Sequence, residues 1–308
     1  KNKEATLVPL TGGVSSDIFI IHDGDRKFVV KRALEKLKVD ADWFADVSRN
    51  EAERAYIQYV AQINSAVVPE IIGEGNGYFV MEHFGNDFIN WKEAMLNGRF
   101  VTDRASMAGS FLRDVHRRTQ NNEEVARQFG NMETFWQLRI DAYLLTTGAR
   151  HPELNAMFLE EAERLKTETS ALVHGDFSPK NILVSPDRFV VLDCEAACYA
   201  DPAFDVAFLF THLFLKTLYH KNYYDEIQSM IRAFLESYGL PNLELEARIA
   251  RLLLMLLMAR VDGKSPVEYL VDENSKQFVR SFSRVELIEN PRGLEMIIDE
   301  WIAGIQAL

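Results

Sequence analysis

Short alternating runs of hydrophobic and polar residues occupy the first eighty positions. Residues 18–21 and 28–31 are rich in Ile, Phe and Val, and the intervening His-Asp-Gly-Asp is typical of a hairpin turn. Residues 70–73 and 78–81 flank a second turn at Gly-Asn-Gly, residues 75–77. The pattern predicts a small antiparallel sheet.

Helical periodicity first appears between these two hairpins, over residues 48–63. Ser48 and Glu51 have the Ser-x-x-Glu spacing of a capping box, which predicts the start of this helix. From about residue 85 onward, long helical segments dominate. We expect helices at Asp103–Thr119, Thr134–Thr146, Pro152–Thr169, Pro202–Tyr219, Tyr223–Tyr238, Leu243–Val261 and Gly293–Ile305.

Three short β-rich runs interrupt the helical part, at residues 171–174, 182–184 and 189–193, and a turn separates the last two. We therefore predict an α+β protein with two lobes. Residues 1–82 would form an N-terminal antiparallel β-sheet lobe with one key helix, and residues 83–308 a mostly α-helical lobe. The hinge would lie at residues 82–85.

Composition excludes several classes of protein. A net charge of −12 argues against a nucleic-acid partner and is compatible with a cationic small substrate. The longest apolar stretches, residues 206–219 and 249–259, are interrupted or too short for the roughly 20 residues that cross a bilayer. With no recognisable secretory segment, we expect a cytoplasmic protein without a membrane partner. Cys194 and Cys198 are expected to be reduced thiols.

A glycine pair near the N-terminus is a candidate phosphate-binding loop. Gly12 and Gly13 would let backbone amides approach phosphate oxygens, and the hydroxyls of Ser15 and Ser16 could add donors. The same residues also suit an ordinary turn. Asp17, which follows directly, is an unfavourable neighbour for phosphates.

A lysine closes the otherwise apolar run at residues 28–31. Lys31 could direct its charge into a cleft, although a strand-end lysine commonly reaches solvent. A buried lysine needs a carboxylate, and the following helix offers Glu51 and Glu53. We favour Glu53, because it shares a helical face with apolar residues and Glu51 is already assigned to the capping box.

The most informative segment is residues 174–181, His-Gly-Asp-Phe-Ser-Pro-Lys-Asn. Asp176 and Asn181 have the H-x-D-x-x-x-x-N spacing of a kinase catalytic loop. Asp176 would accept or orient the proton of a substrate hydroxyl. Asn181 and Asp193 offer oxygen ligands that suit Mg²⁺, which would neutralise the developing phosphate charge. One such motif could be a chance polar turn, but the ordered set of motifs predicts phosphoryl transfer.

These motifs make the chain resemble the aminoglycoside phosphotransferase and choline kinase-like superfamily. The resemblance runs from Thr6 to Leu209 and is most specific from residue 173 on, with Leu-Val-His-Gly-Asp, Asn-Ile-Leu-Val, Val-Leu-Asp-Cys-Glu and Ala-Asp-Pro-Ala-Phe-Asp-Val-Ala. It implies a protein-kinase-like fold that binds ATP, with Asp205 bracing the catalytic loop. It also implies that adenine pairs with the main-chain carbonyl of Glu82 and the amide of Phe84.

Departures from protein kinases point to a small acceptor. Only seven residues separate Asp193 from Asp201, and no Ala-Pro-Glu sequence follows, so there is no room for a peptide-docking activation loop. We expect an enzyme that transfers the γ-phosphoryl group of ATP to a hydroxyl of an aminoglycoside, choline, ethanolamine, or similar amino alcohol or sugar. Glu195 and Asp201 could face a cationic acceptor, or could be solvated or capping residues.

Two alternatives stay open. The residues after Asp193 are similar to a stretch of methylthioribose kinase-like proteins, which would make the acceptor a sugar. The C-terminal segment, residues 299–308, is mostly apolar and so lacks the acidic character general in aminoglycoside kinases. From a different class, a catalytically inactive nucleotide-binding protein of the same fold is disfavoured because the candidate base, lysine and metal ligands are all present.

Overall fold

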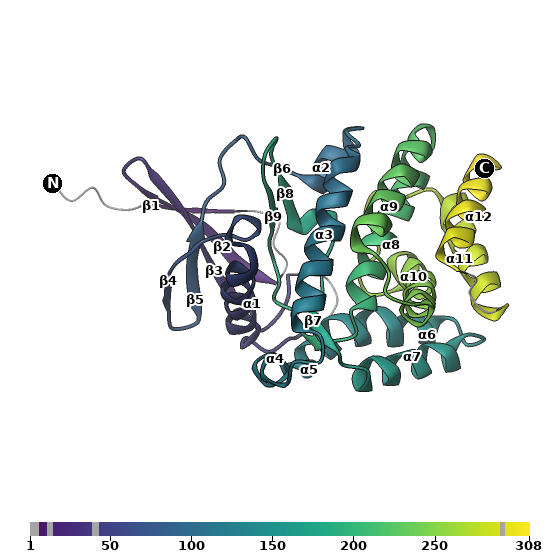
Figure 1. Cartoon of the computed structure of the whole chain (residues 1–308), viewed down its shortest axis with the longest axis horizontal. Helices are drawn as coiled ribbons and strands as arrows, with labels where there is room; N and C mark the ends of the chain where they lie inside the picture. Colours follow the sequence, from purple (N-terminus) through teal and green to yellow (C-terminus); the bar gives the residue numbers. More distant parts are fainter. Residues whose placement is uncertain (1–5, 11–14, 39–42, 290–292) are drawn as a thin grey trace.

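An antiparallel five-stranded sheet forms the N-terminal end of the molecule in the computed structural model, which describes residues 6–10, 15–38, 43–289 and 293–308. The strand order is β1-β2-β3-β5-β4. One helix, α1 (Arg49–Asn64), lies beside this sheet (Figure 1). The strands are β1 (Thr6–Pro9), β2 (Ser16–Asp23), β3 (Arg26–Ala33), β4 (Ile71–Gly75) and β5 (Tyr78–Glu82).

Helices make up most of the chain after Glu82 and lie at the opposite end from the sheet (Figure 1). They are α2 (Trp91–Leu96), α3 (Thr102–Thr119), α4 (Glu123–Gln128), α5 (Met132–Phe135), the π-helix η2 (Trp136–Leu145), α6 (Thr146–Arg150), α7 (Asn155–Thr167), α8 (Ala203–Tyr219), α9 (Tyr224–Tyr238), α10 (Leu243–Asp262), α11 (Glu273–Ile288) and α12 (Leu294–Gln306). Single 3-10 turns occur at η1 (Ser65–Val67), η3 (Pro179–Asn181) and η4 (Lys221–Tyr223).

Two small sheets lie between these ends and carry the loop at residues 174–181. One has the order β6-β8-β9, and the other pairs β10 with β7 in antiparallel register. Their strands are β6 (Ile89–Asn90), β7 (Ala171–Val173), β8 (Ile182–Val184), β9 (Phe189–Val191) and β10 (Cys198–Ala200). The loop thus begins at the end of β7 and ends at the start of β8.

The predicted α+β architecture is confirmed, with differences in detail. Both N-terminal hairpins and all the predicted long helices are present, although the segment at residues 134–146 is largely π-helical. The hydrophobic pattern did not predict several short or strongly polar elements, which are β1, β6, β10, α2, α4 and α11. Helix α11 is polar on most of its surface, and its start is marked by Asp272, whose side chain accepts hydrogen bonds from the amides of Asn274 and Ser275.

The predicted capping box at the start of α1 is wrong. Ser48 already has helical backbone angles, and its side chain makes no capping hydrogen bond. The carboxylate of Asp46 instead accepts a hydrogen bond from the amide of Ser48 at 2.7 Å, which turns the chain into the helix. The side chain of Glu51 is exposed, and only its amide takes part in this turn, by donating to the carbonyl of Ser48 at 2.9 Å.

Helices α8 and α10 form the centre of the helical part. Both are buried over most of their length, in keeping with their apolar composition on all sides. Cys194 and Cys198 are buried free thiols, as predicted. Among the described residues, no helix is both long and apolar enough to cross a membrane.

Asp201 belongs to this packed interior, and its suggested contact with the acceptor is not supported. It is 1% exposed, and its carboxylate pairs with Arg164 at 2.6 Å and Arg248 at 2.9 Å. It also accepts a hydrogen bond from the amide of Ala203 at 2.9 Å, at the start of α8. The alternative assignment as a helix-capping residue is therefore correct, and the physical reason is that two arginines and an amide occupy its oxygens.

Replacing Asp201 with Ala is expected to lower the free energy of unfolding by about 2 kcal/mol, because the half-buried Arg164 and Arg248 each lose one carboxylate partner and the amide of Ala203 loses its acceptor. Urea denaturation measures the change. Asp299→Ala is the matched control: it removes an exposed partner of Arg232 and should cost about 0–1 kcal/mol. Equal effects in the two variants would contradict the structural role of Asp201.

Candidate active site

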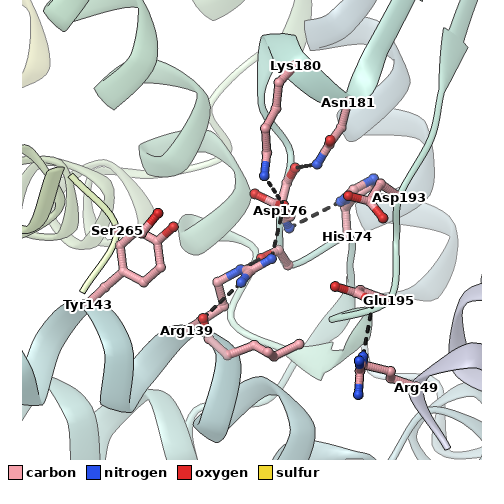
Figure 2. A network of polar contacts seen from close by, with 12 residues as sticks. Arg49, Arg139, Tyr143, His174, Asp176, Lys180, Asn181, Asp193, Glu195 and Ser265 are labelled. Carbon is pink, nitrogen blue, oxygen red and sulfur yellow. Dashed lines mark hydrogen bonds and ion pairs between the residues drawn. The ribbon is translucent and has the colours of Figure 1, made fainter. Parts of the chain in front are cut away.

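A cleft of about 800 Å³ separates the N-terminal sheet from the helical part. Its walls include Lys31 and Glu53 from the sheet side and Asp176, Asn181 and Asp193 from the other side. The structure therefore brings together five residues that the sequence singled out from four separate segments. Figure 2 shows the part of this group that surrounds Asp176.

The loop that carries Asp176 is fixed by its backbone. Gly175 has φ +74°, and a Cβ there would lie 2.4 Å from the carbonyl oxygen of Ala196, so only glycine fits. Asp205, in the first turn of α8, accepts hydrogen bonds from the amides of His174 at 2.7 Å and Gly175 at 2.9 Å. The bracing role expected for Asp205 is thus confirmed.

His174 is a neutral structural residue of the same loop. Its Nδ1 accepts a hydrogen bond from the amide of Asp176 at 3.1 Å, so Nε2 carries the hydrogen and donates to the carbonyl of Leu192 at 3.0 Å. Burial lowers the pKa of His174, which favours this uncharged form. The imidazole therefore links the loop to the chain just before Asp193.

Asp176 is a buried carboxylate held between two cations. Its Oδ2 lies 3.1 Å from Arg139 and 3.0 Å from Lys180, whereas its buried Oδ1 has no hydrogen-bond partner among the described residues. Burial acts to raise the pKa of Asp176, but Arg139 and Lys180 outweigh it and lower the pKa below its ordinary value. An ionised carboxylate with one unpartnered oxygen in a cleft is suited to accept a proton.

Arg139 was not predicted from the sequence. It is 5% exposed, and its guanidinium donates to the carbonyls of Gly175 and Leu138 as well as contacting Asp176. It lies in the π-helix η2, a rare geometry that is frequent at functional sites. The sequence signal for this role was a single arginine within a mostly apolar helical stretch. Such an arginine has no fixed spacing from the catalytic loop, so no motif predicts it.

On the opposite wall, Lys31 connects the sheet to the helical part. Its ammonium lies 2.7 Å from Glu53 and also contacts Asp193. The choice of Glu53 over Glu51 as the partner is confirmed. Burial acts to lower the pKa of Lys31, but Asp193 and Glu53 outweigh it and raise the pKa, so the lysine remains charged.

Asn181 and Asp193 fit the binding of a hard divalent cation such as Mg²⁺. The Nδ2 of Asn181 donates to the carbonyl of Asp176 at 2.9 Å, which leaves its Oδ1 as a free acceptor. Lys31 contacts only Oδ1 of Asp193, whose pKa is lowered because Lys31 and Lys180 outweigh the effect of burial. No cluster of three His, Cys, Asp or Glu side chains suited to a metal occurs in the described part of the chain. Phosphate oxygens and water would complete the coordination.

Glu195 lines the cleft, but an arginine from the N-terminal part occupies one of its oxygens. Arg49 is fully buried at the start of α1, and its Nε lies 3.1 Å from Oε2 of Glu195. The same guanidinium donates to the carbonyls of Ser15, Leu34 and Ala45. Glu195 therefore joins the two parts of the molecule, and an acceptor contact through it stays a prediction.

The structure describes only two of the four residues of the predicted phosphate-binding loop. Gly12 and Gly13 lie outside the described residues. Ser15 lines the cleft, and Ser16 is buried with no hydrogen-bond partner for its hydroxyl among the described residues. The phosphate role of all four residues stays a prediction.

The side chains of Glu82 and Phe84, the two residues expected to contact adenine through the main chain, make other contacts. The carboxylate of Glu82 pairs with Arg188 at 2.8 Å, and the ring of Phe84 lies 4.9 Å from that of Phe88. Neither residue is among those lining the cleft, whereas the neighbouring Met81 is. This arrangement is compatible with adenine contacts through the main chain, which remain a prediction.

Comparison with known proteins identifies the family. The sequence model of the phosphotransferase enzyme family matches residues 6–250, well over half of the chain. The chain belongs to this family. A methylthioribose kinase from Exiguobacterium sibiricum is 24% identical to this phosphotransferase over 241 residues, which are 69% of the chain but only 62% of that kinase. The match thus spans less than two thirds of the relative's length.

Solved structures of kinases share the fold. A choline kinase from Cryptosporidium parvum superposes with a TM-score of 0.58 at 12% identity, covering 94% of this chain and 91% of that one. An ethanolamine kinase from Plasmodium vivax has a TM-score of 0.53 at 14% identity, covering 92% and 82%. The predicted bilobal protein-kinase-like fold is confirmed, and at these identities the similarity establishes the fold alone.

Replacing Arg139 with Gln is expected to move the acid limb of the pH–rate profile to higher pH. Without the guanidinium, one of the two cations that lower the pKa of Asp176 is lost, so this pKa rises above that of the parent and a higher pH is needed to ionise the carboxyl. The profile of kcat/KM between about pH 4 and 8 measures the shift, with the limb of the parent at the lower pH. Arg127→Gln, on the exposed face of α4, is the control. An unchanged limb in the Arg139 variant would refute the assignment.

Proposed function

We propose that this phosphotransferase is a kinase that transfers the γ-phosphoryl group of ATP to a hydroxyl of a small molecule. The observation that carries the proposal is a pair of ionised carboxylates, the buried Asp176 and the half-buried Asp193, in one cleft with Lys31 and Asn181. The two aspartates suit different tasks. Asp176 has an unpartnered oxygen for a proton, and Asp193 contacts the lysine.

The reaction would proceed by direct transfer. As the acceptor oxygen forms its bond to the γ-phosphorus, the bond from that phosphorus to the bridging β,γ-oxygen breaks and ADP leaves. The hydroxyl proton passes to Oδ1 of Asp176. Arg139 and Lys180 hold the other oxygen of that carboxylate, which leaves Oδ1 as the oxygen that can take the proton. The aspartate would thus orient the hydroxyl before it accepts the proton.

Lys31 would bind the α- and β-phosphates and is kept in place by Glu53. A divalent cation bound by Asn181 and Asp193 supplies electrostatic stabilisation of the phosphate charge. Asp193 and Lys31 contact each other in this structure. Binding of nucleotide and cation would change this contact, because Lys31 would then contact phosphate and Asp193 would contact the metal. All of these residues are present and face one cleft, which disfavours the alternative of an inactive nucleotide-binding protein.

The relatives differ in their acceptors. Methylthioribose, choline and ethanolamine appear in the names of the matched kinases, and all three carry a hydroxyl. The shared requirement is therefore an alcohol rather than a particular skeleton. The short segment between Asp193 and Asp201 supports a small acceptor over a protein, since no peptide-docking loop fits there.

Asp176→Asn is expected to lower kcat for acceptor-dependent ADP release by roughly 10²- to 10⁴-fold, because the amide cannot take the proton. The assay measures ADP with Mg²⁺ across a panel of amino alcohols, aminoglycosides, sugars and sugar acids. Asp225→Asn, at an exposed position in the first turn of α9, is the control and should match the parent. The proposed function fails if no acceptor exceeds water, or if Asp176→Asn is as active as the parent.

A further inference from the structure

One end of the cleft is lined by hydrogen-bond donors that phosphoryl transfer itself does not require. Tyr143, from η2, and Ser265, after α10, lie side by side there, across from Asp176 (Figure 2). Behind them, Nη1 of Arg260 donates to the hydroxyl of Tyr143 at 3.1 Å and to that of Ser265 at 3.0 Å. Because each hydroxyl oxygen accepts from the guanidinium, each keeps its own hydrogen to donate toward the cleft.

Cations outnumber carboxylates in the lining at this end. Four cationic side chains line it: Lys92, Arg139, Lys180 and Lys264. The carboxylates that line the same end are Asp176 and Glu93, and Asp176 is already shared by two of the cations. The nucleotide end holds the remaining carboxylates of the cleft, Glu53, Asp193 and Glu195.

Two of these lysines have their partners outside the cleft. Lys264 pairs with Asp141 at 2.6 Å, and Lys92 pairs with Glu268. Both carboxylates are substantially exposed, at 41% and 64% of the side chain, so these ion pairs are weak and easily rearranged. The lysines can therefore turn toward a ligand at little cost.

Further positive charge lies behind the lining. Lys216 and Arg260 are buried, and the ammonium of Lys216 lies 3.4 Å from the centre of the Tyr269 ring. Burial lowers the pKa of Lys216 to about 7, and the charge of Lys92 acts in the same direction. His212 is kept neutral, since burial and then Arg260 and Lys216 lower its pKa. Of this layer, Arg260 carries the full positive charge that favours an anionic group in the cleft, whereas Lys216 is only partly charged near pH 7.

A cationic acceptor has few partners here, because Asp176 is already shared by two cations and Glu93 is the one other carboxylate described in the lining at this end. Recognition of an ammonium group uses carboxylates or open aromatic faces. The ring of Tyr143 is already near two cations, with the guanidinium of Arg139 at 6.0 Å and that of Arg260 at 5.7 Å from its centroid. Although the whole chain has a net charge of −12, the side chains that line this end of the cleft are mostly cationic.

We infer that the acceptor carries an anionic oxygen group, a carboxylate or a phosphate ester, which binds to Lys264 together with the hydroxyls of Tyr143 and Ser265. The inference rests on the proposed function and specifies the class of acceptor for that site. The acceptor hydroxyl lies at Asp176, and the anionic group lies at the far end of the same small molecule. The site thus selects a hydroxy acid or a phosphorylated polyol over an amino alcohol.

A matched set of polyols tests the inference. Gluconate, sorbitol and glucamine share a six-carbon polyol chain and differ in carrying an acid, a neutral or an amino end, and sorbitol 6-phosphate distinguishes a phosphate ester from a carboxylate. We expect kcat/KM for gluconate or sorbitol 6-phosphate to exceed that for sorbitol and glucamine by about tenfold or more, as a charge-assisted contact provides. A preference for glucamine, or none among the four, overturns the inference.

The variant Lys264→Gln should remove most of this preference, and sorbitol turnover should change little. Lys276→Gln is the matched control, because Lys276 has a similar exposure, 30% against 28%, and likewise pairs with one carboxylate. It should keep the preference of the parent. An equal preference in Lys264→Gln and the parent overturns the assignment of Lys264.

Binding gives a second readout that does not depend on turnover. Gluconate and sorbitol 6-phosphate should raise the melting temperature of the parent more than sorbitol and glucamine do, and Lys264→Gln should lose the difference. Equal shifts for all four compounds overturn the inference. Failure of the proposed function is distinct: Asp176→Asn would then match the parent in ADP release whatever the charge of the acceptor.

Discussion

A buried carboxylate, held ionised between two cations, is the constraint on which the site depends. Asp176 is 4% exposed and would favour its neutral form if it stood alone. Arg139 and Lys180 reverse that tendency, and they come from different elements, the π-helix η2 and the catalytic loop itself. The helical part must therefore fold around this triad before the base exists in its reactive form.

Much of the surrounding structure fixes the geometry of this triad. Asp205 binds two successive amides of the loop, and His116 lies 3.3 Å from the same carboxylate. Tyr238, on α9, lies 3.0 Å from the other ring nitrogen of His116. A chain of buried polar contacts thus runs from α9 through α3 and α8 to Gly175. Such networks fix one geometry when every member is satisfied.

The nucleotide side depends on two contacts between the sheet and the helical part. Lys31 reaches Asp193, and Arg49 reaches Glu195, two residues further along. Both cations are almost fully buried and their partners follow β9, so the sheet is positioned by the segment that carries the candidate metal ligand. Any closing of the cleft around a nucleotide would act on both pairs, because they join the same two parts.

The sequence predicted what depends on local pattern or on fixed spacing. The hairpins, the long amphipathic helices, the Lys31–Glu53 pair and the loop at residues 174–181 all followed from periodicity or motif. Arg139, Arg49 and the Tyr143–Ser265 pair did not, because their roles depend on contacts between segments with no fixed separation. The predicted capping box at the start of α1 was wrong for a related reason. The Ser-x-x-Glu spacing was present, but the side chain that binds a backbone amide there is that of Asp46.

We propose that Asn181 and Asp193 hold the divalent cation while Asp176 remains free for the acceptor. A crystal structure with Mn²⁺ and a non-hydrolysable ATP analogue tests this directly, because anomalous scattering locates the manganese. The expected result is a manganese peak within about 2.3 Å of oxygens from Asn181 and Asp193, with Oδ1 of Asp176 facing open cleft. Manganese bound by Asp176, or a nucleotide outside this cleft, would contradict the account.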